Sequence, residues 1–174
     1  MTTPVRVVRA LDSGMRVPAV DILFEYMAMT QGEVGETVPA SIAELPRQFR
    51  AECEQPERSY AYPGTLLVAC VEDDVVGCVG LRPSLALPRT VEVKRLYVRP
   101  AYRRNGIART LMTSAHEHAA AAGFTRTVLD VMPTRTEVIA FYRRLGYRDT
   151  EPYHDWPMVY LDRPCQGSTH TGTQ

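Results

Sequence analysis

One segment constrains this sequence more than any other: an apolar strand that runs into a helix through a short, arginine-containing turn. The pattern of residues 91–98 predicts the strand, and helical periodicity begins at Ile107. The first amides of a helix have no partner inside the helix, so a helix N-terminus attracts anions. Gly106 permits close approach to the backbone, and Arg103 and Arg104 add charge-assisted hydrogen bonds to phosphate oxygens. We therefore expect this turn to hold a phosphate, in particular a pyrophosphate.

Two familiar phosphate-binding loops do not fit this turn. A Walker loop requires G-x-x-x-x-G-K-[ST], which the sequence lacks, and a dinucleotide fingerprint requires more glycines than the single one in residues 103–108. The remaining pattern is [Q/R]-x-x-G-x-[G/A], formed by Arg103, Arg104, Asn105, Gly106, Ile107 and Ala108. Taken alone, this short run is also compatible with a solvated basic turn, so the rest of the chain has to decide.

Length and composition favour one compact domain with an adequate core, because the chain has 174 residues of which 45% are hydrophobic. The formal net charge is zero, which gives no support for a nucleic-acid partner or an anionic membrane. No stretch approaches the ~18 apolar residues of a membrane span, and no secretory signal is visible. We expect a cytoplasmic protein with one domain over residues 1–162 and a disordered tail over 163–174.

The four cysteines indicate neither a metal site nor a disulfide framework. Cys53, Cys70, Cys78 and Cys165 show no CxxC pair and no zinc-type spacing with histidine. Cys70 and Cys78 lie in apolar, strand-like runs, which favours buried free thiols. A catalytic cysteine would need a nearby base, and the sequence offers no specific one.

Hydrophobic periodicity predicts the element order β-α-α-β-β-β-α-β-α-β-β. Strands are expected over residues 5–10, 66–72, 75–81, 91–98, 126–131, 147–150 and 158–162. Helices are expected from a cap at Asp12 or Ser13 to a break at Gly32 and Gly35, over 47–54, over 106–122, and from a Thr134-x-x-Glu137 capping box to Gly146, with a loop over 58–64. This order indicates an α/β chain with a central mixed, mostly antiparallel sheet flanked by helices.

Four segments in this order resemble the GNAT superfamily of N-acetyltransferases. Residues 103–108 resemble the superfamily's pyrophosphate signature for coenzyme A, residues 91–100 its fourth strand, and residues 140–147 its last helix. Residues 77–83, together with Pro152-Tyr153, are similar to a bacterial subgroup of largely unassigned substrate. The chain departs from the pattern at Ala108, where glycine is usual, and at Arg135, where asparagine is common.

The resemblance implies the GNAT fold, with the fourth strand splayed from the fifth, and an acetyltransferase that uses acetyl-CoA and no metal. It places the amides of Leu96, Tyr97 and Val98 against pantetheine and the thioester carbonyl, and residues 103–108 on the pyrophosphate. It also makes Tyr142 the general acid that protonates the thiolate, because a phenol keeps its proton near neutral pH. The alternative for Tyr142 is an amphipathic core tyrosine.

The resemblance suggests Glu92 as the general base, because this glutamate lies eleven residues before Arg103, where some family members carry one. A structural pair of Glu92 with Lys94 is the alternative, and a water chain or His154 would then serve as the base. The acceptor pocket is expected near Glu25, Tyr26, Tyr153, His154, Asp155 and Trp156.

The acceptor is expected to be a small-molecule or peptide amine, without nucleic-acid or membrane partners, and a homodimer is possible. Two other functions stay open: a non-catalytic acyl-CoA-binding or regulatory module, and an acyltransferase for a longer acyl group.

Overall fold

The computed structural model describes residues 4–166, which form two compact units. The first unit contains residues 4–82 and 94–115, and the second contains residues 83–93 and 116–166. The single domain expected over residues 1–162 therefore stays a prediction. Among the described residues, no helix combines the length and the apolar character needed to cross a membrane.

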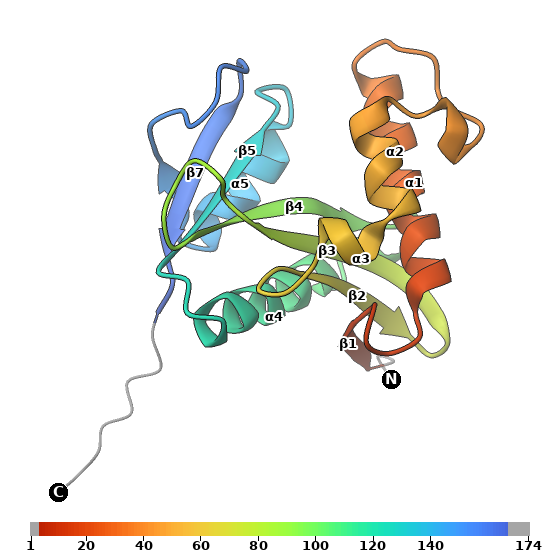
Figure 1. Cartoon of the computed structure of the whole chain (residues 1–174), viewed down its shortest axis with the longest axis horizontal. Coiled ribbons are helices and arrows are strands. Elements are labelled where there is room, and N and C mark those ends of the chain that lie inside the picture. The colour runs from red at the N-terminus through yellow and green to blue at the C-terminus, as the bar shows by residue number, and fades with distance from the viewer. Residues whose placement is uncertain (1–3, 167–174) are drawn as a thin grey trace, which may run out of the picture. The chain divides into compact units, whose positions relative to one another are not determined.

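The elements follow the expected order, with one additional short helix (Figure 1). The strands are β1 (Val5–Arg9), β2 (Thr65–Val71), β3 (Asp74–Pro83), β4 (Thr90–Val98), β5 (Arg126–Val131), β6 (Arg148–Asp149) and β7 (Val159–Pro164). The helices are α1 (Arg16–Glu33), α2 (Arg47–Glu54), α3 (Pro56–Ser59), α4 (Ile107–Ala121) and α5 (Thr136–Arg144), with 3-10 turns η1 (Ile42–Glu44) and η2 (Pro100–Tyr102).

The strands pair in the order β1-β2-β3-β4-β5-β7-β6. Strand β4 pairs with β5 in parallel, whereas the pairs β1/β2, β2/β3, β5/β7 and β6/β7 are antiparallel. This confirms the expected mixed sheet. The register of β4 with β5 joins residues 90–92 to residues 126–128, and β4 then continues to Val98.

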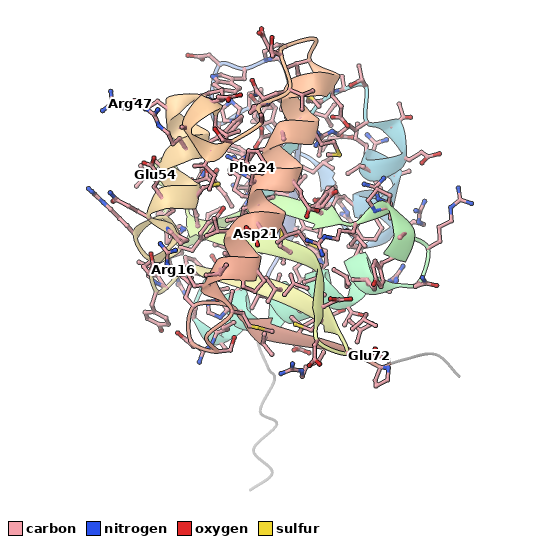
Figure 2. All side chains as sticks on the ribbon, turned by 90° about the vertical axis from the view of Figure 1, so that its right-hand side faces the viewer. Arg16, Asp21, Phe24, Arg47, Glu54 and Glu72 are labelled. Carbon is pink, nitrogen blue, oxygen red and sulfur yellow. The ribbon has the colours of Figure 1, made fainter. Side chains whose placement is uncertain are left out.

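The core of the first unit lies between its strands and helices α1 and α2. Leu23 of α1 and Cys53 of α2 pack in one buried cluster with Leu66 of β2 and Cys78 of β3. Figure 2 shows α1 and α2 side by side, and the Arg16 side chain of α1 donates to the Glu54 carbonyl of α2 at 3.2 Å. The two helices therefore cover one face of these strands.

Helix α4 covers the other face of the same strands. Successive side chains of a strand point to opposite faces, and Gly77 precedes Cys78 in β3. A Cβ atom placed on Gly77 would lie 3.1 Å from the Leu111 side chain of α4. Glycine at this position therefore favours close packing of α4 against the strand.

The core of the second unit is built on β5, β7 and α5. Ile139 and Tyr142 point inward from α5, and the strands contribute buried Val128, Leu129 and Leu161. The spacing of the two α5 residues is helical, which explains why one stripe of this short helix is buried.

Both expected helix N-caps are wrong. Helix α1 begins at Arg16 after Met15, without a side-chain cap, and the Ser13 hydroxyl donates back to the Ala10 carbonyl at 3.4 Å. Helix α5 begins at Thr136 after Arg135, also without a side-chain cap, so Thr134 and Glu137 do not form a capping box. In both places the backbone makes an extra turn before the helix starts, with amide-to-carbonyl bonds from Met15 to Ala10 and from Arg135 to Met132.

Helix α1 ends at Glu33, between Gly32 and Gly35, where the break was expected. Two other expectations need correction. The expected loop over 58–64 begins inside α3. Strand β7 includes Arg163 and Pro164, which were assigned to the tail, because it continues pairing with Arg126 and Thr127 of β5. Residues 167–174 of that tail lie outside the described residues.

Candidate functional site

The turn between β4 and α4 in the first unit has the geometry that the sequence predicts. Residues 103–106 are exposed, and α4 begins directly after them at Ile107. Arg104 and Gly106 both have left-handed backbone angles, with φ of 64° and 76°. A Cβ atom on Gly106 would have no neighbour within 4 Å, so this face of the turn is open to a ligand. The turn therefore presents the start of α4 to solvent.

Arg103 is fastened to the end of β4. Its Nε donates to the Val98 carbonyl at 2.8 Å, and its guanidinium carbon lies 5.7 Å from the centre of the Tyr97 ring. Asn105 donates from Nδ2 to the Tyr102 carbonyl at 3.4 Å. Exposed Arg104 is thus the side chain of this turn best placed to meet an anion, and Arg103 shapes the turn.

Strand β4 is distorted just before Leu96, Tyr97 and Val98. These are the residues whose amides the family resemblance places against pantetheine and the thioester carbonyl. Arg95 has a left-handed φ of 60° in the strand interior. A non-glycine residue in that region costs free energy and is kept only where its surroundings hold it there. The Arg95 side chain makes two hydrogen bonds to Glu52 of α2, at 3.0 and 2.7 Å. The sequence did not single out Glu52 or Arg95 at all.

In the second unit, Tyr142 is buried in an aromatic cluster. Tyr142 is only 6% exposed, and the centre of its ring lies 5.5 Å from the ring centres of both Phe141 and Tyr147. The ring thus packs as a core residue does. A ring packed on these sides also fixes the position of its hydroxyl oxygen. Core packing of Tyr142 is therefore compatible with a role as the general acid.

Glu92, Tyr153 and His154 come together in the second unit, with Asp130 of β5 as a fourth member. Burial raises the pKa of Tyr153, and the nearby carboxylates of Asp130 and Glu92 raise it further. Nε2 of His154 lies 3.8 Å from an Asp130 carboxylate oxygen, and its Nδ1 lies 2.7 Å from the Tyr160 hydroxyl. Asp130 was not singled out from the sequence, although an acidic residue within the apolar strand over 126–131 was a signal that could have identified it.

Two other residues expected to line the acceptor pocket, Trp156 and Glu25, do not lie in one place. Trp156 is 60% exposed, and its ring centre lies 6.0 Å from that of His154. Glu25, by contrast, lies in the first unit and pairs with Arg99, where two of its hydrogen bonds measure 2.6 and 2.9 Å. Within residues 4–166, no group of three or more acidic, histidine or cysteine side chains is arranged to hold a metal ion.

The cysteines in the core are buried thiols. Cys70 and Cys78 are 1% and 0% exposed. Burial raises the pKa of Cys78 to about 12, with the charge of Glu25 adding to the effect. Since the thiolate is the reactive form, neither burial nor charge favours a nucleophilic role for Cys78.

The partly buried His116 forms a polar group with the buried Tyr147 and Thr127 in the second unit. The Nε2 atom of His116 lies 2.8 Å from the Tyr147 hydroxyl, which also accepts from the Thr127 hydroxyl at 3.1 Å. Burial, with a contribution from the charge of Arg163, lowers the pKa of His116 from an ordinary 6.5 to about 4. The folded protein therefore holds His116 neutral at neutral pH.

This shift predicts a loss of stability on mild acidification. Between pH 6.5 and 4 the unfolded chain binds a proton at His116 that the folded chain excludes, so its contribution is complete above pH 6.5 and falls toward pH 4. The total loss over this window is up to about 3 kcal/mol. Urea unfolding of the wild type and His116→Gln at pH 7 and 5 measures it: the variant should lose less stability on acidification. An equal loss in both proteins would contradict the assignment.

Comparisons with known proteins agree on the family. The acetyltransferase (GNAT) family matches residues 36–147. An uncharacterized N-acetyltransferase of Schizosaccharomyces pombe is 34% identical over 115 residues, which cover 63% of this chain and 70% of the yeast protein. A GNAT-family acetyltransferase structure from Staphylococcus aureus superposes with a TM-score of 0.73 at 14% identity, covering 94% of this chain and all of that one. The PaiA N-acetyltransferase of Thermoplasma acidophilum, in complex with coenzyme A, gives 0.61 at 15% identity, with coverage of 94% and 99%.

Proposed function

Because this chain belongs to the GNAT family of acetyltransferases, we propose that it transfers an acetyl group from acetyl-CoA to the nitrogen of a primary amine. The observation that carries this proposal is the open, left-handed turn at Arg104 and Gly106, set directly before helix α4. A diphosphate is the group that such a helix start and its arginines fit best. Acetyl-CoA, when bound, supplies the activated acyl group.

The first unit is proposed to bind the cosubstrate. Residues 103–108 hold its pyrophosphate through the exposed amides at the start of α4 and the guanidinium of Arg104. The amides of Leu96, Tyr97 and Val98 pair with pantetheine and point at the thioester oxygen. Backbone donors aimed at an oxygen that gains negative charge are an effective way of lowering the barrier to acyl transfer.

The second unit is proposed to supply the proton transfers. Glu92 accepts a proton from the ammonium form of the amine, and the Asp130 carboxylate beside it favours a cationic acceptor. The amine nitrogen then forms a bond to the acyl carbon, the carbon–sulfur bond breaks, and the nitrogen releases its second proton to solvent. Tyr142 gives its hydroxyl proton to the departing sulfur, so that free coenzyme A leaves as a thiol, and the phenolate of Tyr142 regains a proton from solvent.

His154 is the second candidate for the base. Its Nδ1 faces the Tyr160 hydroxyl and its Nε2 faces Asp130, so both ring nitrogens have partners that fix the orientation of the ring. A histidine held in this way suits a proton-transfer role. A comparison of Glu92→Gln with His154→Gln separates the two, since the true base is the one whose loss removes the acidic limb of the pH–rate profile.

Three further points belong to the proposal. A non-catalytic acyl-CoA-binding module is the alternative function, and a longer acyl group is the alternative donor. Membership in a bacterial subgroup stays a prediction, because the matched relatives include a yeast protein. A cytoplasmic location, an acceptor that is a small molecule or a peptide, and a homodimer are likewise proposed.

Binding of coenzyme A by the turn can be tested with a pair of matched glycine variants. Gly106→Val should weaken binding of coenzyme A about tenfold or more, since a β-branched residue is strained at a φ of 76° and its side chain enters the open face of the turn. Gly123→Val is the control, because Gly123 follows the other end of α4 with a φ of 85° and equally open surroundings. Isothermal titration with coenzyme A gives both affinities. Equal weakening in both variants would exclude the turn as the binding site.

A further inference from the structure

Two arginine–glutamate ion pairs bracket the segment that carries Leu96, Tyr97 and Val98. Arg95, just before the segment, binds Glu52 of α2 through Nε at 3.0 Å and a terminal nitrogen at 2.7 Å. Arg99, just after it, binds Glu25 of α1 in the same two-pronged way, at 2.9 and 2.6 Å. All of these residues belong to the first unit. Paired contacts of this kind fix the direction of a guanidinium as well as its position.

The pair at Arg95 is buried and shared with other side chains. Glu52 is 3% exposed, and it also accepts from the Tyr60 hydroxyl at 2.7 Å and from Arg82 at 3.1 Å. The guanidinium carbon of Arg95 lies 4.8 Å from the centre of the Phe49 ring. Burial alone would raise the pKa of Glu52, but its hydrogen bonds with Arg95 and the two arginine charges lower it, so the carboxylate stays ionised. The left-handed backbone of Arg95 is thus held by its own side chain.

The pair at Arg99 fastens the other end of the segment. The Arg99 amide donates to the Val76 carbonyl of β3 at 2.9 Å, while its side chain reaches Glu25. Arg103 adds a bond to the Val98 carbonyl. The backbone between Arg95 and Arg99 is therefore held at both ends, with its carbonyl at Val98 already occupied.

We propose that Glu52 and Glu25 are positioning residues that clamp residues 96–98 in the conformation that follows the left-handed backbone of Arg95 and that their amides require to act. This rests on the proposed function, in which those amides meet the thioester. Two clamps four residues apart leave the intervening backbone few alternative conformations, so its donors are oriented before a ligand arrives. Donors oriented in advance need no rearrangement as negative charge develops on the thioester oxygen. A merely structural pair would tie a helix to a strand without affecting this segment.

The test compares Glu25→Gln and Glu52→Gln with a matched control, Glu57→Gln. Glu57 pairs with Arg16 (Figure 2) in the same unit, and this pair includes neither Arg95 nor Arg99, so its loss removes an ion pair without breaking either clamp. Amide hydrogen exchange at Leu96, Tyr97 and Val98, followed by NMR, should accelerate about tenfold in both clamp variants and not in the control. In acetyl-CoA turnover, kcat/KM for acetyl-CoA should fall about tenfold or more, because the same amides pair with pantetheine and with the thioester oxygen.

The exchange measurement tests the clamp, and thiol release tests the proposed acetyltransferase function, so the two can fail separately. Unchanged exchange at residues 96–98 in Glu25→Gln would overturn the proposal, and so would equal acceleration in Glu57→Gln. Glu25 is partly exposed, so this variant decides the matter even if Glu52→Gln does not fold. If the wild type released no thiol but exchange still changed as expected, the clamp would stand and the acetyltransferase function would fail.

Discussion

Replacing Tyr142 with phenylalanine is expected to lower turnover about 10- to 100-fold while leaving the affinity for coenzyme A unchanged, because the variant loses the proposed proton donor and keeps the ring. The ring of Tyr142 is almost fully buried against Phe141 and Tyr147, and phenylalanine keeps that packing. Initial rates of thiol release at saturating acetyl-CoA give the first quantity, and titration with coenzyme A gives the second. Below the pKa of the free thiol, the deficit should persist at every pH.

Tyr147→Phe is the control for this experiment. Tyr147 packs edge-on against the ring of Tyr142 and is equally buried, but its hydroxyl faces His116 and Thr127. Its loss should lower thermal stability and leave turnover of the folded enzyme close to that of the wild type. If the two variants had the same turnover, Tyr142 would be a core tyrosine without a role in proton transfer.

Replacing Glu52 with alanine is expected to destabilise the fold by about 3–5 kcal/mol, the usual effect of leaving a buried charge without its partner. The variant leaves Arg95, whose side chain is only 15% exposed, without the carboxylate that receives two of its hydrogen bonds. It also removes the acceptor of the Tyr60 hydroxyl, which lies on a residue only 2% exposed. Urea unfolding monitored by circular dichroism measures the loss.

A double replacement separates the charge from the packing. Glu52→Leu combined with Arg95→Met removes both charges and fills the space with apolar atoms, so it should recover more than half of the stability that Glu52→Ala loses. Tyr60→Phe, which removes a single hydrogen bond to the charged Glu52, should cost less, about 1.5–3 kcal/mol. A cost below about 1 kcal/mol for Glu52→Ala would mean that Arg95 finds water or another partner.

The strand, turn and helix over residues 91–122 could be predicted from the sequence because the signals are local. Alternation in β4, an arginine and a glycine in the turn, and a helical stripe in α4 each lie within a few residues of one another. Gly123 and Gly146 ended their helices as expected, since both adopt positive φ. Helix starts were placed less well: residues that fit a cap in sequence made other backbone turns in the structure.

The contacts between distant segments could not be read from the sequence. Glu52 and Arg95 are 43 positions apart, and Glu25 and Arg99 are 74 apart. Glu52 lies in a strongly amphipathic helix where an acidic side chain is ordinary, so only the fold reveals that it faces β4. The left-handed backbone of Arg95 is likewise invisible, because the local preference of arginine argues against it.

The pair of carboxylates in the second unit, Glu92 and Asp130, could be predicted only in part. Glu92 was singled out through the family resemblance, by its position eleven residues before Arg103. Asp130 has no such position, although it too is an acidic residue within an apolar strand. The parallel register, which sets Glu92 opposite Val128, brings the two strands together. That register depends on the whole sheet, and so the second carboxylate became apparent only in the structure.

Thiol release from acetyl-CoA is the measurement that tests the central claim most directly. The wild type is assayed with small amines, amino acids and peptides, with Tyr142→Phe in parallel. Acetyl transfer to an amine predicts release that requires one class of acceptor, yields an N-acetylated product by mass spectrometry, and falls at least about tenfold in the variant. Measurable binding of coenzyme A, with no thiol release from any class, would contradict acetyl transfer and support a non-catalytic acyl-CoA-binding module.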